Sequence, residues 1–427
     1  MPVPKLRFKD DNGNDYPAWE EKKLGDVFFF LKNNSLSRDA LGNHGTVKNI
    51  HYGDVLIKYD SIVDVQKQEI PFIKDLKYLI EFNELEEDKK KFYTLKDGDI
   101  VFADTAEDYT AGKVIEVKNV TCDVVSGLHT IPCRPTVRFE SGFLGQYLNS
   151  NSYHNPIRPL MVGTKVISIN KNELIKTKLR IPTLPEQKKI ADFFSSFDKR
   201  IETTQKKLAT LEKLKKGFMQ KIFSQRLRFK DDNGNDYPAW EMKKFGDVMD
   251  DFSYGMNVSS KRFDGRNKYI RITDIDESTH KYDSSDIVSP DGKLEQKYLV
   301  KDGDILFART GASVGKSYLY NSEDGNLYFA GFLIRGRVKS SYNPYFIYLQ
   351  TLTFNYKKWV YVFSMRTGQP GINAEEYRSF KFLCPSLPEQ KKIADFLSAF
   401  DEKMDLVRKE VDTLQTIKKG LLQQMFV

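Results

Sequence analysis

The sequence of 427 residues is poor in cysteine and contains no long apolar run. Its three cysteines, Cys122, Cys133 and Cys384, are scattered in apolar segments, as is typical of buried thiols in a reducing cytoplasm. No stretch reaches the roughly 20 apolar residues that a membrane span requires. The first residues also lack the apolar segment of a secretory signal. We therefore expect a cytoplasmic protein without membrane contact.

Motifs for catalysis and metal binding are missing or incomplete. Cys122, His129 and Cys133 match no zinc spacing and lack a fourth ligand. Asn343-Pro344-Tyr345-Phe346 is similar to the amine-binding motif of adenine-N6 methyltransferases, but it lacks one proline and no glycine-rich cofactor loop lies upstream. Neither a Gly-x-Ser-x-Gly elbow nor a His-Glu-x-x-His pair occurs. We expect a chain that is not an enzyme and that holds no metal or cofactor of its own.

Residues 307–317, "FARTGASVGKS", are close to a nucleotide-binding loop. That motif requires four residues between its first glycine and Gly-Lys-Ser/Thr, followed by a helix whose N-terminus holds the phosphate. Here three residues separate Gly311 from Gly315, and Tyr318-Leu319-Tyr320 predicts a short strand followed by a turn. The segment is therefore not expected to bind a nucleotide.

Positive charge is in modest excess and is unevenly distributed. The net charge is +8. Residues 185–226 contain eleven basic and five acidic residues, which gives +6, whereas residues 388–427 contain seven of each. This balance is compatible with an anionic partner such as DNA, but a uniformly basic nucleic-acid binder has a different distribution.

The strongest feature is an internal repeat. Residues 6–23 recur at 227–244 with seventeen of eighteen positions identical, and residues 184–198 recur at 387–401 with thirteen of fifteen identical. "LKDGDIVFADT" at 95–105 is a weaker match to "VKDGDILFART" at 300–310, and the remaining body of each half has diverged. A constant frame with two different bodies predicts a protein that recognises two different things.

Both repeats end in a long predicted helix with a heptad stripe. Proline at position 185 or 388 suits the first helical turn. The predicted seam residues are Ile190, Phe194, Phe197, Ile201, Leu208, Leu211, Phe218 and Ile222, and in the second helix Ile393, Leu397, Phe400, Met404, Val407, Val411, Leu414, Leu421 and Met425. A lysine interrupts each stripe, at Lys215 and Lys418. Matched stripes favour pairing of the two helices, and the alternative is that each packs on its own domain.

The bodies are predicted to be mixed α/β. Strands are expected near residues 99–102, 268–272, 304–308 and 328–338, and helices near 142–153 and 345–356. The predicted division is a first domain at 1–184, a helix at 185–226, a second domain at 227–387 and a helix at 388–427.

Polar loops of the bodies carry the candidate DNA contacts, because arginine can bind guanine, glutamine adenine and aspartate the amine of cytosine. The candidates of the first half are Asp104, Thr105, Lys113, His154, Arg158, Thr164 and Lys165. Those of the second half are Arg309, Thr310, Ser313, Lys316, Arg366, Thr367 and Gln369. Any one of them is also compatible with ordinary solvated surface. The different chemistry of matching positions favours two readers of different sequences.

The sequence resembles the specificity subunit of a type I restriction-modification system over essentially its full length. The resemblance is carried by both "LPEQKKIADF" segments, by Trp19–Val27 and Trp240–Val248, by the Asp-Gly-Asp-Ile strands and by "GQPGIN" at 368–373. It implies two target recognition domains joined by an antiparallel pair of coiled-coil helices with a pseudo-twofold repeat. It also places residues 309–316 and 366–369 in recognition loops.

The resemblance further implies a bacterial, non-catalytic subunit that binds double-stranded DNA. Each domain reads half of a bipartite target, and the helices set the spacer. Two modification subunits use S-adenosylmethionine, and two restriction/translocase subunits use ATP and Mg. The alternatives are a scaffold with two protein-binding domains on a coiled coil, or a stand-alone nuclease or methyltransferase.

Overall fold

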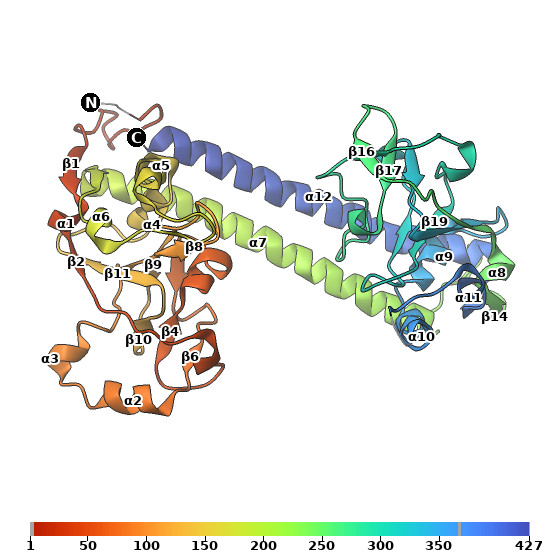
Figure 1. Cartoon of the computed structure of the whole chain (residues 1–427), viewed down its shortest axis with the longest axis horizontal. Helices are drawn as coiled ribbons and strands as arrows, with labels where there is room; N and C mark the ends of the chain where they lie inside the picture. Colours follow the sequence, from red (N-terminus) through yellow and green to blue (C-terminus); the bar gives the residue numbers. More distant parts are fainter. Residues whose placement is uncertain (1–3, 366–368, 427) are drawn as a thin grey trace. The chain divides into compact units, whose positions relative to one another are not determined.

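The computed structural model describes residues 4–365 and 369–426, which form two compact units. The first unit comprises Met1–Lys206 with Arg408–Val427, and the second unit comprises Lys207–Val407. Two long helices, α7 (Leu184–Phe223) and α12 (Leu387–Met425), are each divided between the two units, with one part in each (Figure 1). In the described part of the chain, no helix is both long and apolar enough to cross a membrane.

Each unit is built on a sheet with the same strand order. In the first unit the order is β2-β11-β7-β9-β5, and in the second it is β15-β22-β19-β20. The bounds are β2 (Phe28–Phe30), β11 (Thr130–Pro135), β7 (Ile100–Ala103), β9 (Val114–Lys118) and β5 (Ile62–Asp64), then β15 (Met249–Tyr254), β22 (Leu333–Val338), β19 (Asp304–Ala308) and β20 (Ser317–Leu319). The first four strands correspond one to one, so the internal repeat and the mixed α/β class are confirmed.

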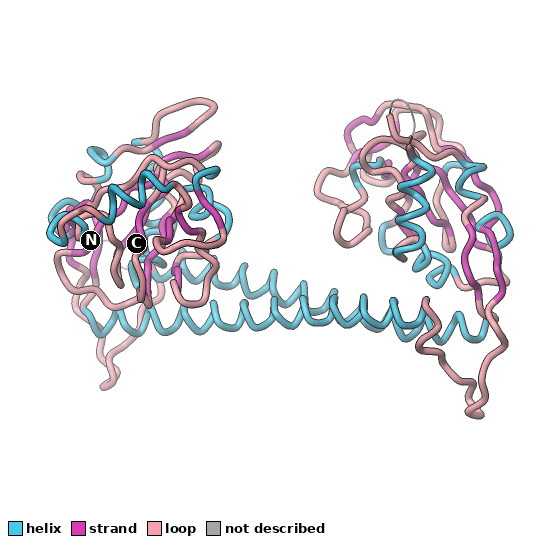
Figure 2. The backbone as a smooth tube through the Cα atoms, turned by 90° about the horizontal axis from the view of Figure 1, so that it is seen from below, coloured by secondary structure: helices cyan, strands magenta, loops and turns pink. Residues whose placement is uncertain are grey.

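Each unit also contains smaller sheets, and Figure 2 colours all strands magenta. In the first unit they are β1 (Glu20–Lys23) with β13 (Lys178–Ile181), β8 (Thr105–Ala106) with β12 (Ile167–Ser168), and β10 (Val124–Ser126), β4 (Lys48–Ile50), β6 (Phe72–Ile73) and β3 (Leu41–Gly42). In the second they are β14 (Glu241–Lys244) with β23 (Lys381–Cys384), β16 (Ser260–Arg262) with β18 (Val288–Pro290), and β17 (Lys268–Ile270) with β21 (Leu327–Phe329).

The helices of the bodies are short. The first unit contains α1 (Leu24–Val27), α2 (Leu76–Asn83), α3 (Glu87–Lys90), α4 (Phe143–Leu148), α5 (Asn151–Ile157) and α6 (Lys171–Leu174). The second contains α8 (Phe245–Val248), α9 (Pro344–Gln350), α10 (Phe354–Ser364) and α11 (Ala374–Arg378).

Three predicted elements are interrupted in the structure. The helix expected at 142–153 is split into α4 and α5, because the Asn149 side chain bonds both the backbone N–H and the carbonyl of Val114. The helix expected at 345–356 is likewise split into α9 and α10, where Thr353 caps the second helix. The strand expected at 328–338 is interrupted at Gly331, whose N–H donates to the Met256 carbonyl at 2.7 Å. Residues 304–308 form β19 as predicted.

Every predicted seam residue is buried or half-buried, and Leu208, Leu211, Phe400, Met404 and Val407 of the two helices pack in one cluster. Residues near the helix starts, such as Ile190 and Ile393, also belong to the cores of their units. In the first unit, Asp198 pairs with Lys418 at 2.5 Å and Phe194 stacks on Phe426. In the second unit, Lys215 pairs with Asp401, also at 2.5 Å. Phe218 contacts Phe396 in the second unit as well, so in both units residue numbers rise along one helix as they fall along the other and the pairing is antiparallel. The lysines that interrupt the stripes are neutralised by carboxylates of the repeated helix starts.

Buried carboxylates explain why the ends of the repeat are nearly identical. Glu186 is fully buried at the start of α7, where it accepts hydrogen bonds from Arg7 at 2.7 Å and from the Trp19 indole at 3.1 Å. Glu389 at the start of α12 accepts from Arg228 at 2.7 Å and Trp240 at 3.0 Å. A buried charge is tolerated only when it is paired and hydrogen-bonded. We call each set a carboxylate latch: Arg7–Trp19–Glu186 and Arg228–Trp240–Glu389.

Candidate nucleic-acid interface

The segment "FARTGASVGKS" forms a β-hairpin loop. β19 and β20 pair antiparallel, with Phe307 opposite Ser317, and the loop closes through a hydrogen bond from the Gly315 N–H to the Ala308 carbonyl at 2.9 Å. Gly315 has φ +83°, and a Cβ added there would lie 2.5 Å from Val360 of α10. Glycine is therefore required for backbone conformation and close packing on α10. The predicted strand after the loop is confirmed, and a nucleotide loop would require a helix there.

Two separate stretches of the second half meet at this loop. The Ile372 N–H donates to the Arg309 carbonyl at 2.9 Å, and the Gly311 N–H donates to the Pro370 carbonyl at 3.0 Å. The exposed Gln369 lies beside Gly311, because a Cβ on that glycine would be 3.3 Å from its Nε2 atom. The predicted residues Arg366 and Thr367 lie outside the described residues.

Arg309 lies between two exposed aromatic rings. Its guanidinium is centred 5.0 Å from the Tyr254 ring and 5.9 Å from the Phe332 ring, and its Nε donates to the Gly331 carbonyl at 3.0 Å. Stacking on aromatic faces orients a guanidinium and reduces the entropy lost on binding. The two rings are separated in sequence from the loop, so the sequence contains no local signal for them, and sequence reasoning missed both. We call Arg309, Tyr254 and Phe332 the arginine stack.

The other candidates of this loop are engaged in its construction. The ammonium of Lys316 pairs with Glu277 at 2.6 Å and donates to the Ile275 carbonyl at 3.1 Å, and its side chain is 9% exposed. The Ser313 carbonyl accepts from the Lys316 N–H at 3.0 Å, and the Thr310 hydroxyl donates to the Pro370 carbonyl at 3.4 Å. Their proposed DNA contacts stay predictions, and the contacts seen here fix the loop.

The first unit has the same backbone arrangement with different side chains. β7 and β9 form the matching hairpin, and the Ile169 N–H donates to the Asp104 carbonyl at 2.8 Å, as Ile372 does to Arg309. The Asp104 carboxylate accepts from the Thr105 hydroxyl at 2.7 Å and lies 3.3 Å from His129 Nδ1. An acidic and imidazole-bearing cluster thus stands where the second unit has the arginine stack.

Two further first-half candidates are tied to backbone carbonyls. Lys113 donates to the carbonyls of Leu56 and Tyr59, both at 2.9 Å, and burial lowers the pKa of Lys113. His154 Nε2 donates to the Ala111 carbonyl at 2.9 Å, and burial lowers the pKa of His154 as well. Both side chains hold the loop between β7 and β9 in place.

Exposed candidates of the first half gather after α5. Arg158, Thr164 and Lys165 are exposed, and the last two lie in a tight turn between Val162 and Ser168, which are joined by two backbone hydrogen bonds at 2.9 and 2.8 Å. These three side chains are accessible to a ligand, and their proposed role stays a prediction.

The remaining features considered in the sequence have structural positions. Asn343 is the N-cap of α9, where its side chain accepts from the Phe346 N–H at 2.9 Å. Cys122 is exposed, so the expectation that all three cysteines are buried is wrong for it: it lies in a bend between β9 and β10, away from either sheet. Cys133 and Cys384 are buried as expected. Among the described residues, no group of three or more histidine, cysteine, aspartate or glutamate side chains is placed to hold a metal ion.

A duplicated mixed α/β unit with divergent loops on a constant frame, combined with paired long helices, defines a class of two-domain proteins. A family model described as the type I restriction modification DNA specificity domain matches residues 17–213 and 238–416. The chain therefore belongs to the family of type I restriction-modification DNA specificity proteins.

Individual relatives agree with this family. The type I restriction enzyme MjaVIII specificity subunit of Methanocaldococcus jannaschii is 26% identical over 61% of this chain, and that match spans 64% of the relative. The putative MjaX specificity subunit of the same organism is 24% identical over 97% of this chain and 94% of its own length. A crystal structure of the S subunit from M. genitalium has a TM-score of 0.57 at 16% identity, covering 100% of this chain and 99% of that one. This structural likeness shows the shared fold.

Proposed function

We propose that this chain is the DNA sequence-specificity subunit of a type I restriction-modification complex and that each unit reads one half of a bipartite, asymmetric target. One observation carries the proposal: the hairpin loops of the two units occupy the same backbone position and carry different side chains. Arg309 lies over the rings of Tyr254 and Phe332, whereas Asp104 lies beside Thr105 and His129. A pair of readers for unlike half-sites requires such a difference.

The side chains fit direct reading of base edges in the major groove. An arginine fork pairs with the O6 and N7 atoms of guanine, and the amide of Gln369 suits adenine. The carboxylate of Asp104 can accept a hydrogen bond from the cytosine amine. We infer that each unit contacts a different base pattern and that the asymmetry of the target follows from these loops.

The proposal assigns this chain a positioning role without catalysis or a cofactor of its own. Two modification subunits supply S-adenosylmethionine-dependent adenine methylation, and two restriction/translocase subunits supply ATP- and Mg-dependent steps. The paired helices support the proposed setting of the spacer, because each is continuous from Leu184 to Phe223 or from Leu387 to Met425.

Lengthening both helices tests this proposal. Seven residues inserted after Lys213 and seven after Lys403 keep the heptad seam in phase. The added length is about 10 Å at 1.5 Å per residue, which corresponds to about 3 base pairs. The variant is expressed with its modification subunits, and adenine methylation is mapped across the host genome. We expect unchanged half-sites separated by a longer gap.

A single insertion provides the control. Seven residues added to α7 alone displace Lys215 from Asp401 and should abolish methylation. Changed half-sites with an unchanged gap would refute the role of the helices. The specificity function would be refuted, and a protein scaffold favoured, if the wild-type complex bound all DNA sequences equally. The same conclusion would follow if it showed no salt-dependent binding to any DNA.

A further inference from the structure

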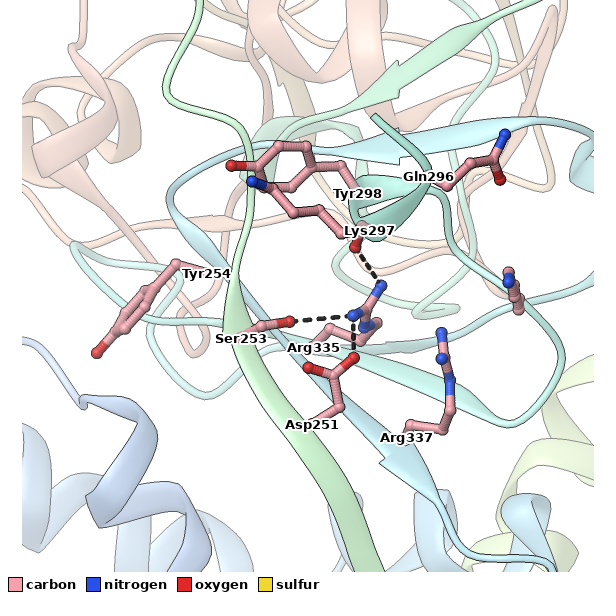
Figure 3. A pocket seen from close by; sticks show the side chains of 9 residues that line it. Asp251, Ser253, Tyr254, Gln296, Lys297, Tyr298, Arg335 and Arg337 are labelled. Atoms are coloured by element: carbon pink, nitrogen blue, oxygen red, sulfur yellow. Dashed lines mark hydrogen bonds and ion pairs between the residues drawn. The ribbon is translucent and has the colours of Figure 1, made fainter. Parts of the chain in front are cut away.

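The second unit contains a basic hollow next to the arginine stack. Its volume is about 490 Å³, and Figure 3 shows the side chains that surround it. They come from β15, from the short helix η5 (Gln296–Tyr298), from the turn before β19 and from β22. The lining residues are Asp251, Ser253, Tyr254, Gln296, Lys297, Tyr298, Lys301, Arg335 and Arg337. We call this space the basic hollow.

Arg335 is a buried cation whose hydrogen bonding is incomplete. It is 3% exposed, and it donates to the Lys297 carbonyl at 2.7 Å and to the Ser253 hydroxyl at 3.1 Å, besides pairing with Asp251. Among the described residues its Nε atom has no hydrogen-bond partner, and the Asp304 carboxylate lies 4.0 Å from it. A buried donor without a partner is costly, so such groups point to a ligand or to strain.

The charges around the hollow leave one positive charge in excess. Four cations line it, namely Lys297, Lys301, Arg335 and Arg337. Three carboxylates pair with them: Asp251 with Arg335, Asp304 with Arg337 at 2.7 Å, and Glu295 with Lys297 at 3.1 Å. The cations that line the hollow therefore outnumber the carboxylates paired with them. The exposed Lys301 is the cation without a carboxylate partner among the described residues.

A phosphodiester group matches this surplus in charge and chemistry. It carries one negative charge, and its oxygens accept hydrogen bonds from arginine and lysine. Arg335 and Arg337 are two residues apart in β22, so their side chains lie on the same face of the sheet, and both line the hollow (Figure 3).

The position of the hollow connects it to DNA reading. Tyr254 lines the hollow, and its ring also supports Arg309 at 5.0 Å. Tyr254 therefore belongs both to the arginine stack and to the wall of the hollow. We propose that the basic hollow binds a backbone phosphodiester of DNA next to the half-site read by the second unit. This inference rests on the proposed DNA-reading function.

Lysine substitutions test the proposal without disturbing the buried arginine. Lys301→Ala and Lys297→Ala remove one exposed cation each, and Lys381→Ala is the matched control, an exposed lysine of the same unit that does not line the hollow. Binding is measured with the full chain in its complex with modification subunits, by fluorescence anisotropy between 50 and 200 mM salt. One lost phosphate contact lowers the salt slope by about 0.9, so the affinity ratio of wild type to Lys301→Ala should shrink about 3.5-fold over this range. The preference among DNA sequences should not change.

Neutral linkages in the DNA locate the phosphate. Single methylphosphonate substitutions are placed along the target, and we expect one linkage beside the second unit's half-site to weaken wild-type binding as much as Lys301→Ala does. The same methylphosphonate should not weaken binding by the Lys301→Ala complex any further. The lysine variants should unfold at the same temperature as the wild type.

Several results would overturn the inference. The inference would be wrong if both lysine variants kept the affinity and the salt slope of the wild type. It would also be wrong if the loss of affinity caused by Lys301→Ala added to the loss caused by each methylphosphonate, whatever its position. If inorganic phosphate competed with DNA but no single methylphosphonate weakened binding, the hollow would be a site for a free phosphate ion instead. A wild-type complex without sequence preference would contradict the proposed function itself, which is a distinct result.

Discussion

The hairpin loops at 104–113 and 309–316 are closed by the same main-chain hydrogen bonds and differ in length and in side-chain chemistry. In both units the residue after the buried strand accepts a hydrogen bond from an isoleucine, Ile169 or Ile372, at 2.8 or 2.9 Å. In both, a glycine N–H closes the loop onto the last strand residue, at 2.7 Å for Gly112 and 2.9 Å for Gly315. Main-chain bonds thus hold the loops, and the side chains are free to differ.

The lysines at the ends of these loops support the same conclusion. Lys113 and Lys316 both donate to backbone carbonyls inside their own units. A residue that is alike in both readers holds the frame, whereas Asp104 and Arg309 differ and are the better candidates for base contacts. Differences between the halves are therefore more informative about recognition than similarities.

Hollows beside the two loops also differ. The hollow of the first unit has a volume of about 400 Å³ and includes Asp104 and His129. Its lining residues include no lysine or arginine among those described, whereas the basic hollow of the second unit has four. We expect the second unit to depend more strongly on the DNA backbone and the first on polar contacts.

The largest expected effect comes from breaking one carboxylate latch. Glu389→Ala leaves Arg228 and Trp240 without their buried partner, and removing one member of a buried pair costs about 3–5 kcal/mol. Glu186→Ala should have the same effect on the first unit. Hydrogen exchange should rise in β14 and β23 for the first variant and in β1 and β13 for the second.

The exposed Glu20 provides the control for the latches, because its side chain is 71% exposed and Glu20→Ala should leave exchange unchanged. If one latch variant accelerated hydrogen exchange equally in both units, the latches would not stabilise the units separately.

An intermediate effect is expected from exchanging the reading side chains. Arg309→Ala should weaken binding about 5- to 150-fold on targets with the correct second half-site and relax the preference there, since a bidentate base contact discriminates by about 1–3 kcal/mol. Asp104→Ala should relax only the other half-site. Competition binding with DNAs altered in one half-site measures both.

Arg309→Lys is the informative control for this pair of variants. It keeps the charge but loses the planar fork, so it should resemble Arg309→Ala in sequence preference. Equal weakening on every sequence would instead make Arg309 a phosphate contact.

The smallest effect is a dependence of stability on pH. Burial lowers the pKa of His154 in the first unit and of His280 in the second, below the ordinary value of 6.5. Above that pH the folded and unfolded imidazoles are both neutral. As the pH falls below 6.5, the unfolded histidine takes up a proton before the folded one does, so the free energy of unfolding decreases. Burial also lowers the pKa of His51 in the first unit, so His154→Gln should reduce this loss in the first unit without removing it, as measured by urea unfolding at pH 7.5 and 5.5. A pH dependence of the first unit that is unchanged in that variant would show that His154 does not contribute to it.

Much of the fold could be predicted because it repeats. Two near-identical segments and two heptad stripes indicate the duplication and the helix pairing, and β19 was located to the residue. Helix breaks at Asn149 and Thr353 were missed, because they depend on bonds between a side chain and a distant strand or on a new cap. Four candidate site residues, Lys113, His154, Thr310 and Lys316, have side-chain contacts inside the fold that spacing does not reveal.

The sequence by itself determined that two similar bodies stand on matched helices, because periodicity and repetition are local properties of a chain. It also determined that residues 307–317 are no nucleotide loop, since one residue and a helix are missing. Only the tertiary structure decided that Tyr254, Arg309 and Phe332 form one stack and that Arg335 and Lys301 face one hollow. These residues come from strands and turns far apart in sequence, and side chains so separated meet only through the pairing of β15, β22 and β19.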